Sequence, residues 1–203
     1  MISLSFSIIL SYFLGSIPTA FLVGRGLKGI DIRKYGSGNV GATNVFRVVG
    51  KRWGIAVLVF DALKGGLATT LVPRFFPQAF ASPFLASLLC GIAAISGHTW
   101  TVWLGFKGGK GVATSAGVFL ALAPKAAGTA LLVWILVFSW KRYVSLASIV
   151  TALTFPLGIF CFYRRGDTFS VLFPTGLLLA AFILYTHRAN LQRLKGGTEK
   201  KLL

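Results

Sequence analysis

Long apolar segments alternate with short polar connections along most of the chain. Most of these segments are about 20 residues long and carry few charges, which is the length a helix needs to cross a lipid bilayer. They lie at residues 3–24, 53–72, 80–103, 143–163 and 168–186, with a further apolar run from 111 to 140. The pattern predicts an all-α polytopic membrane protein that forms a single membrane-integral domain over residues 1–203.

The run from 111 to 140 decides the number of spans. Pro124 and Lys125 interrupt it, so a split there gives seven spans, whereas a kinked but continuous helix gives six. With seven spans, sixteen Lys and Arg residues share the side of the 25–52 segment and only four lie opposite; six spans give eleven against eight. Because cytoplasmic loops carry an excess of Lys and Arg, we predict seven transmembrane helices, an extracytoplasmic N-terminus and a cytoplasmic C-terminus.

Composition narrows the classes of partner. Only 12% of the residues are charged, against about a quarter in an ordinary soluble protein. A net charge of +17 could suggest nucleic acid, but the bases cluster beside apolar spans, so membrane topology and anionic ligands explain them better. We expect no nucleic-acid partner. Four acidic residues, two histidines and two isolated cysteines also lead us to expect no metal and no cofactor.

The first polar motif is Gly36-Ser37-Gly38-Asn39-Val40-Gly41-Ala42-Thr43-Asn44, and Arg47 follows it. Its glycines and small polar side chains disfavour a continuous helix and offer hydroxyl, amide and backbone donors at close range. An arginine three residues beyond Asn44 suits a bidentate grip on phosphate. A flexible cytoplasmic loop is the plainer interpretation, since such residues are common in turns.

The second motif runs from Gly97 to Thr114 and contains Lys107-Gly108-Gly109-Lys110. Backbone N–H groups in a glycine loop before a helix start favour an anion, and the lysines add positive charge. The loop is not a Walker A motif, because Gly111 follows Lys110 where Ser or Thr is required. An interfacial turn with snorkelling lysines is the alternative.

The third motif, residues 185–199, places His187, Asn190 and Arg193 three residues apart, hence on one helical face at the membrane edge. The alternative is an amphipathic anchor that binds anionic lipid. Ser145 follows Lys141-Arg142 at a helix start, where its hydroxyl can cap the helix or donate to an anion.

Polar residues also occur inside the spans. Asp61 and Lys64 lie three residues apart and predict an intramembrane ion pair. We interpret it as structural, with a lesser chance that it orients the site. A lone histidine on an apolar span, such as His98, is best explained as a buried polar residue that hydrogen-bonds to a neighbouring helix.

These motifs resemble a known family. The runs Ser37–Asn44, Phe106–Thr114 and His187-Arg188-x-Asn190-x-x-Arg193-Leu194 occur in the order of the three signature motifs of the bacterial acyl-phosphate:glycerol-3-phosphate acyltransferases. Asp61-x-x-Lys64-Gly65 and Lys141–Ser145 also match. Thr101 stands where the family often has proline and Leu191 where isoleucine is usual, both outside the charged positions.

The resemblance implies a seven-helix enzyme of the bacterial cell inner membrane with its active site on the cytoplasmic face. It would transfer a fatty acyl group from acyl phosphate to the sn-1 hydroxyl of glycerol 3-phosphate. The products would be lysophosphatidic acid and phosphate, in phospholipid biosynthesis. Its partners would be these two substrates and the lipid bilayer, and we expect a monomer.

The resemblance also implies residue roles. The catalytic residues would be Ser37, Arg47, Lys107, Ser145, His187 and Asn190. The substrate phosphates would be bound by Gly38, Asn39, Gly41, Thr43, Asn44, Gly108, Gly109, Lys110 and Arg193.

Acyl phosphate is already activated, so no covalent enzyme nucleophile is needed. The His-x-x-x-x-Asp pair of soluble-type acyltransferases is absent, because Trp103 lies five positions after His98. The hydroxyl proton would pass to the substrate's own phosphate, with His187 as general base in the competing version.

The rival function is a small anion or phosphate transporter. It predicts charges that line a path through the bilayer midplane. Only the charges of Asp61 and Lys64 are so placed, so we favour the enzyme.

Overall fold

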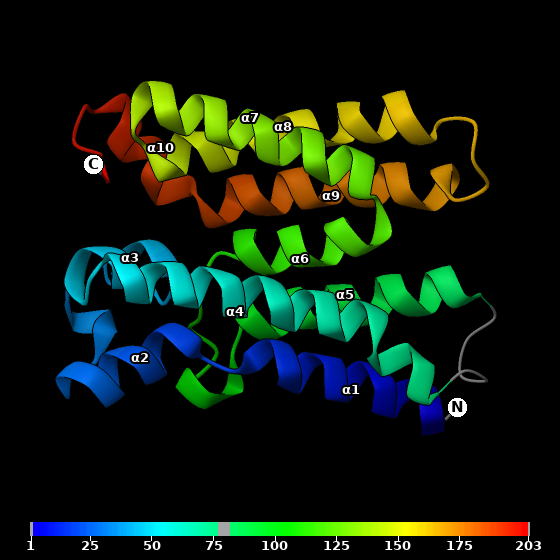
Figure 1. Ribbon diagram of the computed structural model, residues 1–203, viewed down its shortest axis with the longest axis horizontal. Helices are drawn as coiled ribbons and strands as arrows, with labels where there is room; N and C mark the ends of the chain where they lie inside the picture. The colour runs from blue at the N-terminus through cyan, green and yellow to red at the C-terminus, as the bar shows by residue number, and fades with distance from the viewer. Residues whose placement is uncertain (1, 77–81, 203) are drawn as a thin grey trace. The chain divides into compact units, whose positions relative to one another are not determined.

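The computed structural model describes residues 2–76 and 82–202, and every regular element in these ranges is a helix. The chain divides into two compact units, residues 1–122 and 123–203. We call them the N-terminal unit and the C-terminal unit (Figure 1).

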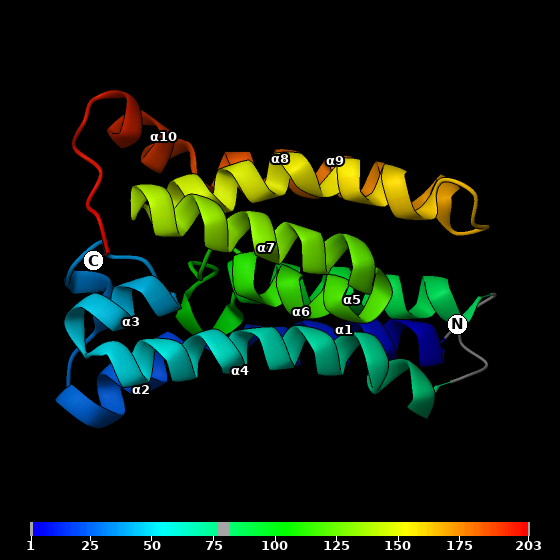
Figure 2. The same cartoon turned by 45° about the horizontal axis from the view of Figure 1, so that its top comes forward.

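The N-terminal unit is a bundle in which α1 packs on α5, and α4 packs on α3, α5 and α6 (Figure 1, Figure 2). Its helices are α1 (Ile2–Ser16), α2 (Thr19–Lys28), α3 (Ala42–Val48), α4 (Lys51–Thr70), α5 (Pro83–Thr99) and α6 (Val112–Leu122). Short 3₁₀ turns occur at Ile32–Lys34, Val72–Phe75 and Val102–Leu104.

The first apolar segment is broken at Ile17-Pro18, between α1 and α2. Proline has no N–H to donate to the preceding turn and clashes with a continuing helix, which accounts for the break. At the break, the carbonyl oxygen of Ile17 accepts the Thr19 N–H at 3.0 Å and a second hydrogen bond from Lys64 Nζ on α4 at 2.9 Å. A side chain of the second span therefore adds to the hydrogen bonding at the break.

The polar segment 25–52 contains helical structure and is not an irregular connection. Helix α2 extends to Lys28, and α3 begins inside the first motif, after Gly41 in extended conformation. A buried apolar cluster holds this segment against α2 and α4; its members are Ala20, Ile32, Val40, Val45, Val57 and Leu104. The small polar residues of the motif thus lie over this buried apolar cluster.

Glycines allow the helices of this unit to approach closely. A methyl group on Gly65 of α4 would lie 2.3 Å from the carbonyl oxygen of Thr114, and one on Gly117 of α6 would lie 1.9 Å from that of Ala62. Both distances are far below van der Waals contact. Small residues at helix contacts are typical of membrane bundles, where close packing replaces the hydrophobic effect.

The C-terminal unit contains α7 (Pro124–Lys141), α8 (Val144–Tyr163), α9 (Phe169–Thr186) and α10 (Arg188–Lys195). α8 packs on both α7 and α9 (Figure 1). Pro124 occupies the first position of α7, where its missing N–H costs nothing. The predicted interruption of the 111–140 run is confirmed, because α6 and α7 are separate helices.

Five helical segments within the described ranges are long and apolar enough to cross a membrane. They are Leu4–Lys28, Lys51–Phe75, Pro83–Leu104, Val144–Tyr163 and Phe169–Thr186. α6 is apolar but has 11 residues, about 16 Å at 1.5 Å per residue. Seven spans and the orientation of the termini stay predictions.

Candidate functional site

In the N-terminal unit, the side chain of Asn44 organises the first motif. Its Oδ1 accepts the Ser37 N–H at 2.9 Å, and its Nδ2 donates to the carbonyl oxygens of Ile32 and Tyr35 at 3.1 and 3.0 Å. Gly36, at φ 62°, passes so close that a methyl group there would lie 2.2 Å from Asn44 Oδ1. These bonds give Asn44 a structural role, and its contact with phosphate stays a prediction.

The other predicted residues of this motif lie in the same short segment, residues 37–47. Ser37 is exposed beside the Asn44 amide, and Arg47 is half-buried one turn further along α3. Gly38, Asn39, Gly41 and Thr43 lie between them. The motif therefore places a hydroxyl and a guanidinium group on one compact segment.

The glycine loop of the second motif packs on the end of α5. Gly108 N–H donates to the Thr99 carbonyl at 2.9 Å, and Gly109 N–H donates to the His98 carbonyl at 3.1 Å. A methyl group on Gly108 would lie 2.1 Å from the His98 carbonyl oxygen. We expected these two N–H groups to face an anion, but the structure uses them to attach the loop to α5.

The lysines of the loop differ in exposure. Lys107 is exposed and Lys110 is half-buried. Between them, a methyl group on Gly109 would lie 2.8 Å from the Val40 carbonyl oxygen of the first motif. The structure thus brings the first and second motifs together within the N-terminal unit.

The predicted intramembrane ion pair is confirmed. Asp61 Oδ1 lies 2.8 Å from Lys64 Nζ, and the two side chains are 2% and 6% exposed. The same oxygen accepts a hydrogen bond from Thr19 Oγ1 at 2.6 Å. His98 Nδ1 approaches it at 3.6 Å, so His98 is buried as expected but contacts Asp61 at more than hydrogen-bond distance.

The C-terminal unit gathers the third motif around a carboxylate. Glu199 Oε1 accepts from Ser145 Oγ at 2.7 Å and from Asn190 Nδ2 at 2.6 Å, while Oε2 accepts from Arg193 Nε at 2.7 Å. The Glu199 side chain is 7% exposed. Ser145 lies in the first turn of α8 and the other two donors lie on α10, so this one carboxylate connects the tail to both helices.

His187 lies at the junction of α9 and α10 and is 3% exposed. Its Nδ1 is 2.9 Å from the Ile183 carbonyl oxygen. A carbonyl can only accept, so Nδ1 is the donor in this contact. Asn190 and Arg193 both donate to Glu199, whereas His187 Nδ1 contacts a carbonyl oxygen of α9.

The surroundings of Glu199 shift its titration. Burial disfavours the charged form, but the hydrogen bonds from Ser145, Arg193 and Asn190 outweigh it and lower the pKa of Glu199 below its usual 4.5. The carboxyl group is therefore ionised at neutral pH and offers two acceptor oxygens to the surrounding donors.

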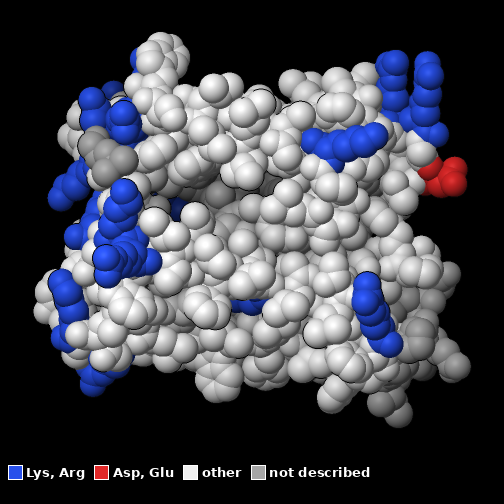
Figure 3. Space-filling view, viewed as in Figure 1, with Lys and Arg blue, Asp and Glu red and all other residues white. Residues whose placement is uncertain are grey.

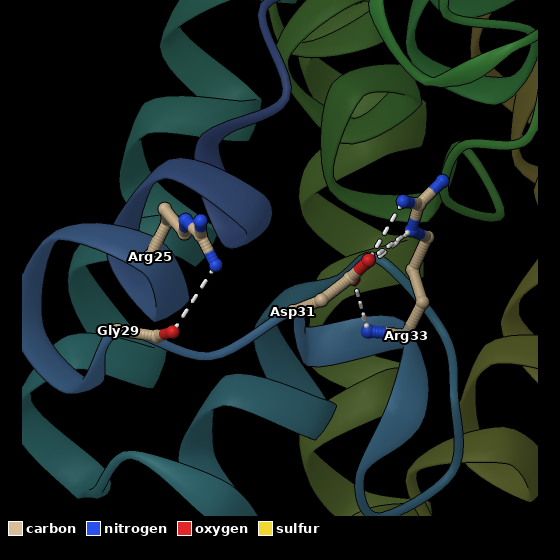
Figure 4. A network of polar contacts seen from close by, with 4 residues as sticks. All are labelled: Arg25, Gly29, Asp31 and Arg33. Atoms are coloured by element: carbon tan, nitrogen blue, oxygen red, sulfur yellow. Dashed lines mark hydrogen bonds and ion pairs between the residues drawn. The ribbon is translucent and has the colours of Figure 1, made fainter.

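A second carboxylate–guanidinium contact lies outside the predicted site, at the 3₁₀ turn after α2 (Figure 4). Asp31 Oδ2 lies 2.7 Å from Arg33 Nη2. This hydrogen bond lowers the pKa of Asp31 to about 2 and raises that of Arg33. In the same view, Arg25 Nη1 donates to the Gly29 carbonyl at 3.2 Å.

Figure 3 shows the charged groups of each unit on one face. In the N-terminal unit, Lys and Arg gather at the end formed by α2 and α3. In the C-terminal unit, one group lies at the α10 end and another lies beside an acidic side chain at the α8–α9 turn. Within the described ranges, no three His, Cys, Asp or Glu side chains form a group that could hold a metal ion.

Comparison with known proteins identifies the family. A sequence model of the family described as glycerol-3-phosphate acyltransferase matches residues 5–197. A protein of that name from Desulforudis audaxviator is 50% identical over 193 residues, covering 95% of this chain and 92% of the relative. Another, from Fusobacterium nucleatum, is 43% identical over 194 residues, covering 96% and 95%. The chain belongs to the glycerol-3-phosphate acyltransferase family.

Two solved structures agree with this assignment. Both are crystal structures of PlsY (YgiH), described as an integral membrane glycerol 3-phosphate acyltransferase, and both are 41% identical to this chain. The glycerol 3-phosphate form has a TM-score of 0.85 and the lysophosphatidic acid form 0.82, each covering 98% of this chain and 95% of the other. With the five apolar segments, this likeness makes the chain a multi-pass membrane protein.

Sequence reasoning about the acyltransferase motifs did not select Glu199. It was included in the third motif only as its last residue, although it is the one acid after Asp167 in a basic tail. An isolated acid among bases is a signal for an ion pair. Its choice of partners depends on how the tail folds back, which spacing along one helix does not reveal.

We predict that Glu199→Gln destabilises the C-terminal unit, by about 1–3 kcal/mol, because an amide brings donors towards groups that themselves donate. The folded-state pKa of Glu199 is lowered, so its stabilising contribution is present above pH 4.5 and is lost as pH falls through the folded-state value. Thermal unfolding in detergent between pH 7 and pH 3 should show the two proteins converging at low pH.

Asp167→Asn is the matched control, since it removes an exposed acid of the same unit. Equal unfolding temperatures of Glu199→Gln and the unaltered protein at pH 7 would contradict the role given to Glu199.

Proposed function

We propose that the protein transfers a fatty acyl group from acyl phosphate to the sn-1 hydroxyl of glycerol 3-phosphate, giving lysophosphatidic acid and phosphate. The family assignment supports glycerol 3-phosphate as acceptor. The observation that supports acyl phosphate as the acyl donor is the number of groups that can bind phosphate: the hydroxyls, lysines and guanidinium groups of the three motifs. An acyl phosphate would bring a second phosphate that such groups suit.

The proposed reaction is a single displacement at the acyl carbonyl. The sn-1 oxygen forms the new ester bond, and the bond between the carbonyl carbon and the bridging oxygen of the acyl phosphate breaks. The departing phosphate keeps the electron pair. The hydroxyl proton passes to a phosphate oxygen of the substrate, so no acidic residue of the enzyme is required as base.

The proposed roles follow from residue chemistry. Lys107 and Arg47 stabilise the oxyanion and the departing phosphate, as preorganised cationic donors do. Ser37 and the glycine-rich residues support them. Ser145, His187 and Asn190 orient the acceptor, and Arg193 and Lys110 add charge for its phosphate.

The direct test uses purified protein in detergent with palmitoyl phosphate and glycerol 3-phosphate. Release of inorganic phosphate that depends on glycerol 3-phosphate, with formation of lysophosphatidic acid, is the expected result. Phosphate flux across liposomes without acyl transfer would favour the transporter instead. Asp61 and Lys64 form an ion pair at 2.8 Å. The pair neutralises the two charges that a transporter would use along its path through the membrane, so it disfavours that function.

Lys107→Ala is predicted to lower kcat/KM for acyl transfer by at least about a hundredfold, because it removes a charged donor from the developing oxyanion or the leaving phosphate. The variant should insert into membranes normally. Lys125→Ala, which removes an exposed lysine at the start of α7, is the control and should keep ordinary activity. Ordinary activity of Lys107→Ala would refute its catalytic role.

His187→Gln separates the two proton acceptors. If the substrate phosphate takes the proton, turnover should fall by no more than about tenfold, since general-base catalysis by a side chain contributes about a hundredfold or more. The rate should be followed from pH 5 to pH 9, with Tyr185→Phe as an exposed neighbouring control. Loss of the neutral-pH limb of the rate profile would transfer the base role to His187.

We also propose seven spans in the bacterial inner membrane, with the site on the cytoplasmic face, because this arrangement places most bases inside. Single cysteines at Lys34 and Lys195 should then react with an impermeant maleimide only from the cytoplasmic side. Cysteines at Arg74 and Arg165 should react from the outside, all in a background without native cysteines. Labelling of Lys34→Cys and Lys195→Cys from opposite sides would contradict the seven-span arrangement.

A further inference from the structure

His98 lies between the buried ion pair and the glycine loop. One edge of its ring places Nδ1 3.6 Å from Asp61 Oδ1. At the other edge, a methyl group on Gly109 would lie 2.1 Å from Nε2 and 2.8 Å from Cε1. The backbone carbonyl of His98 also accepts the Gly109 N–H. A single residue, 8% exposed, therefore contacts the ion pair with its ring and the loop with both ring and backbone.

The carboxylate against which His98 rests is held from several elements. Thr19 of α2 donates to Asp61 Oδ1, and Lys64 of α4 both pairs with it and donates to the Ile17 carbonyl. All these groups lie in apolar segments that are suited to cross the membrane. Without water to replace a lost partner, such contacts keep their geometry, so the pair forms a stiff base for the ring.

The opposite side of the loop is also occupied. The methyl position of Gly109 lies 2.8 Å from the Val40 carbonyl oxygen, so the loop is enclosed between His98 and the first motif. Little free space remains around the loop, so a shift of the His98 ring would displace Gly109. Lys107 and Lys110 flank that residue and would move with it.

We propose that Asp61, Lys64 and His98 are positioning residues for the loop of residues 107–110, and that the position of this loop sets the affinity for a phosphate-bearing substrate. The affinity clause rests on the proposed function, while the support of the loop is independent of it. The three residues act through the loop without touching the substrate. A displacement of about 1 Å in such a group can cost on the order of a hundredfold in activity.

The kinetic test compares His98→Ala with His98→Gln. Alanine removes the ring, and the KM for at least one substrate should rise on the order of tenfold while kcat changes little. Glutamine can place its amide where Nε2 lies, so it should recover most of the affinity. A fall in kcat with both KM values unchanged would overturn the proposal, because it would place His98 in the chemical step.

A milder pair of variants covers the case in which His98→Ala fails to fold. Thr19→Val removes the hydroxyl that donates to Asp61 and keeps the shape of the side chain. Thr69→Val removes a fully buried hydroxyl of α4 that donates to the Gly65 carbonyl of its own helix. We expect a raised KM for Thr19→Val and an unaltered KM for Thr69→Val; equal effects of both would overturn the proposal.

Hydrogen–deuterium exchange of the peptide covering residues 105–112 provides a readout that needs no turnover. The amides of Gly108 and Gly109 are hydrogen-bonded to α5, so they should exchange slowly in the unaltered protein and faster in His98→Ala and Thr19→Val. Thr69→Val should match the unaltered protein. Unchanged exchange in both test variants would overturn the support of the loop.

The two readouts separate this inference from the proposed function. If the unaltered protein shows no acyl transfer, the proposed function and the affinity clause fail, and exchange alone decides whether the loop is supported. If acyl transfer is normal in the unaltered protein but neither exchange nor KM responds in His98→Ala, only the present inference fails.

Discussion

A carboxylate inside a membrane-spanning segment has no water around it, so the protein itself must supply every group that stabilises its charge. Asp61 obtains these groups from α2 and α4, and His98 of α5 borders it. Removing one partner of a buried ion pair typically costs about 3–5 kcal/mol. The positions of several helices in the N-terminal unit therefore depend on the Asp61 side chain. His98, which borders that side chain, also belongs to the second motif.

The two units present polar groups in different ways. In the N-terminal unit, glycines allow loops to pack against helix ends and against each other. The positively charged side chains lie on these loops. In the C-terminal unit, a carboxylate gathers hydroxyl, amide and guanidinium donors from α8 and α10. The first arrangement depends on the absence of side chains and the second on a charge, so the two groups of predicted residues should tolerate different substitutions.

Sequence patterns were sufficient for the apolar segments, the interruption at Pro124 and the Asp61–Lys64 pair, because each depends on local composition or on spacing within one helix. They were insufficient where a side chain chooses among distant partners. The amide of Asn44 folds its own segment, and Gly108 and Gly109 give their N–H groups to α5. Glu199 collects donors 9 and 54 residues away. Those choices follow from tertiary packing, which spacing does not encode.

The break at Ile17-Pro18 also bears on how the chain enters the membrane. The Ile17 carbonyl at the break accepts the Thr19 N–H and also a hydrogen bond from Lys64, 47 residues later in the sequence. While only the first segment is synthesised, that oxygen has the Thr19 N–H but lacks the charged donor from Lys64. The hydrogen bonding at the break is thus completed only after residues 51–75 have followed the first segment, which couples the two segments during biogenesis.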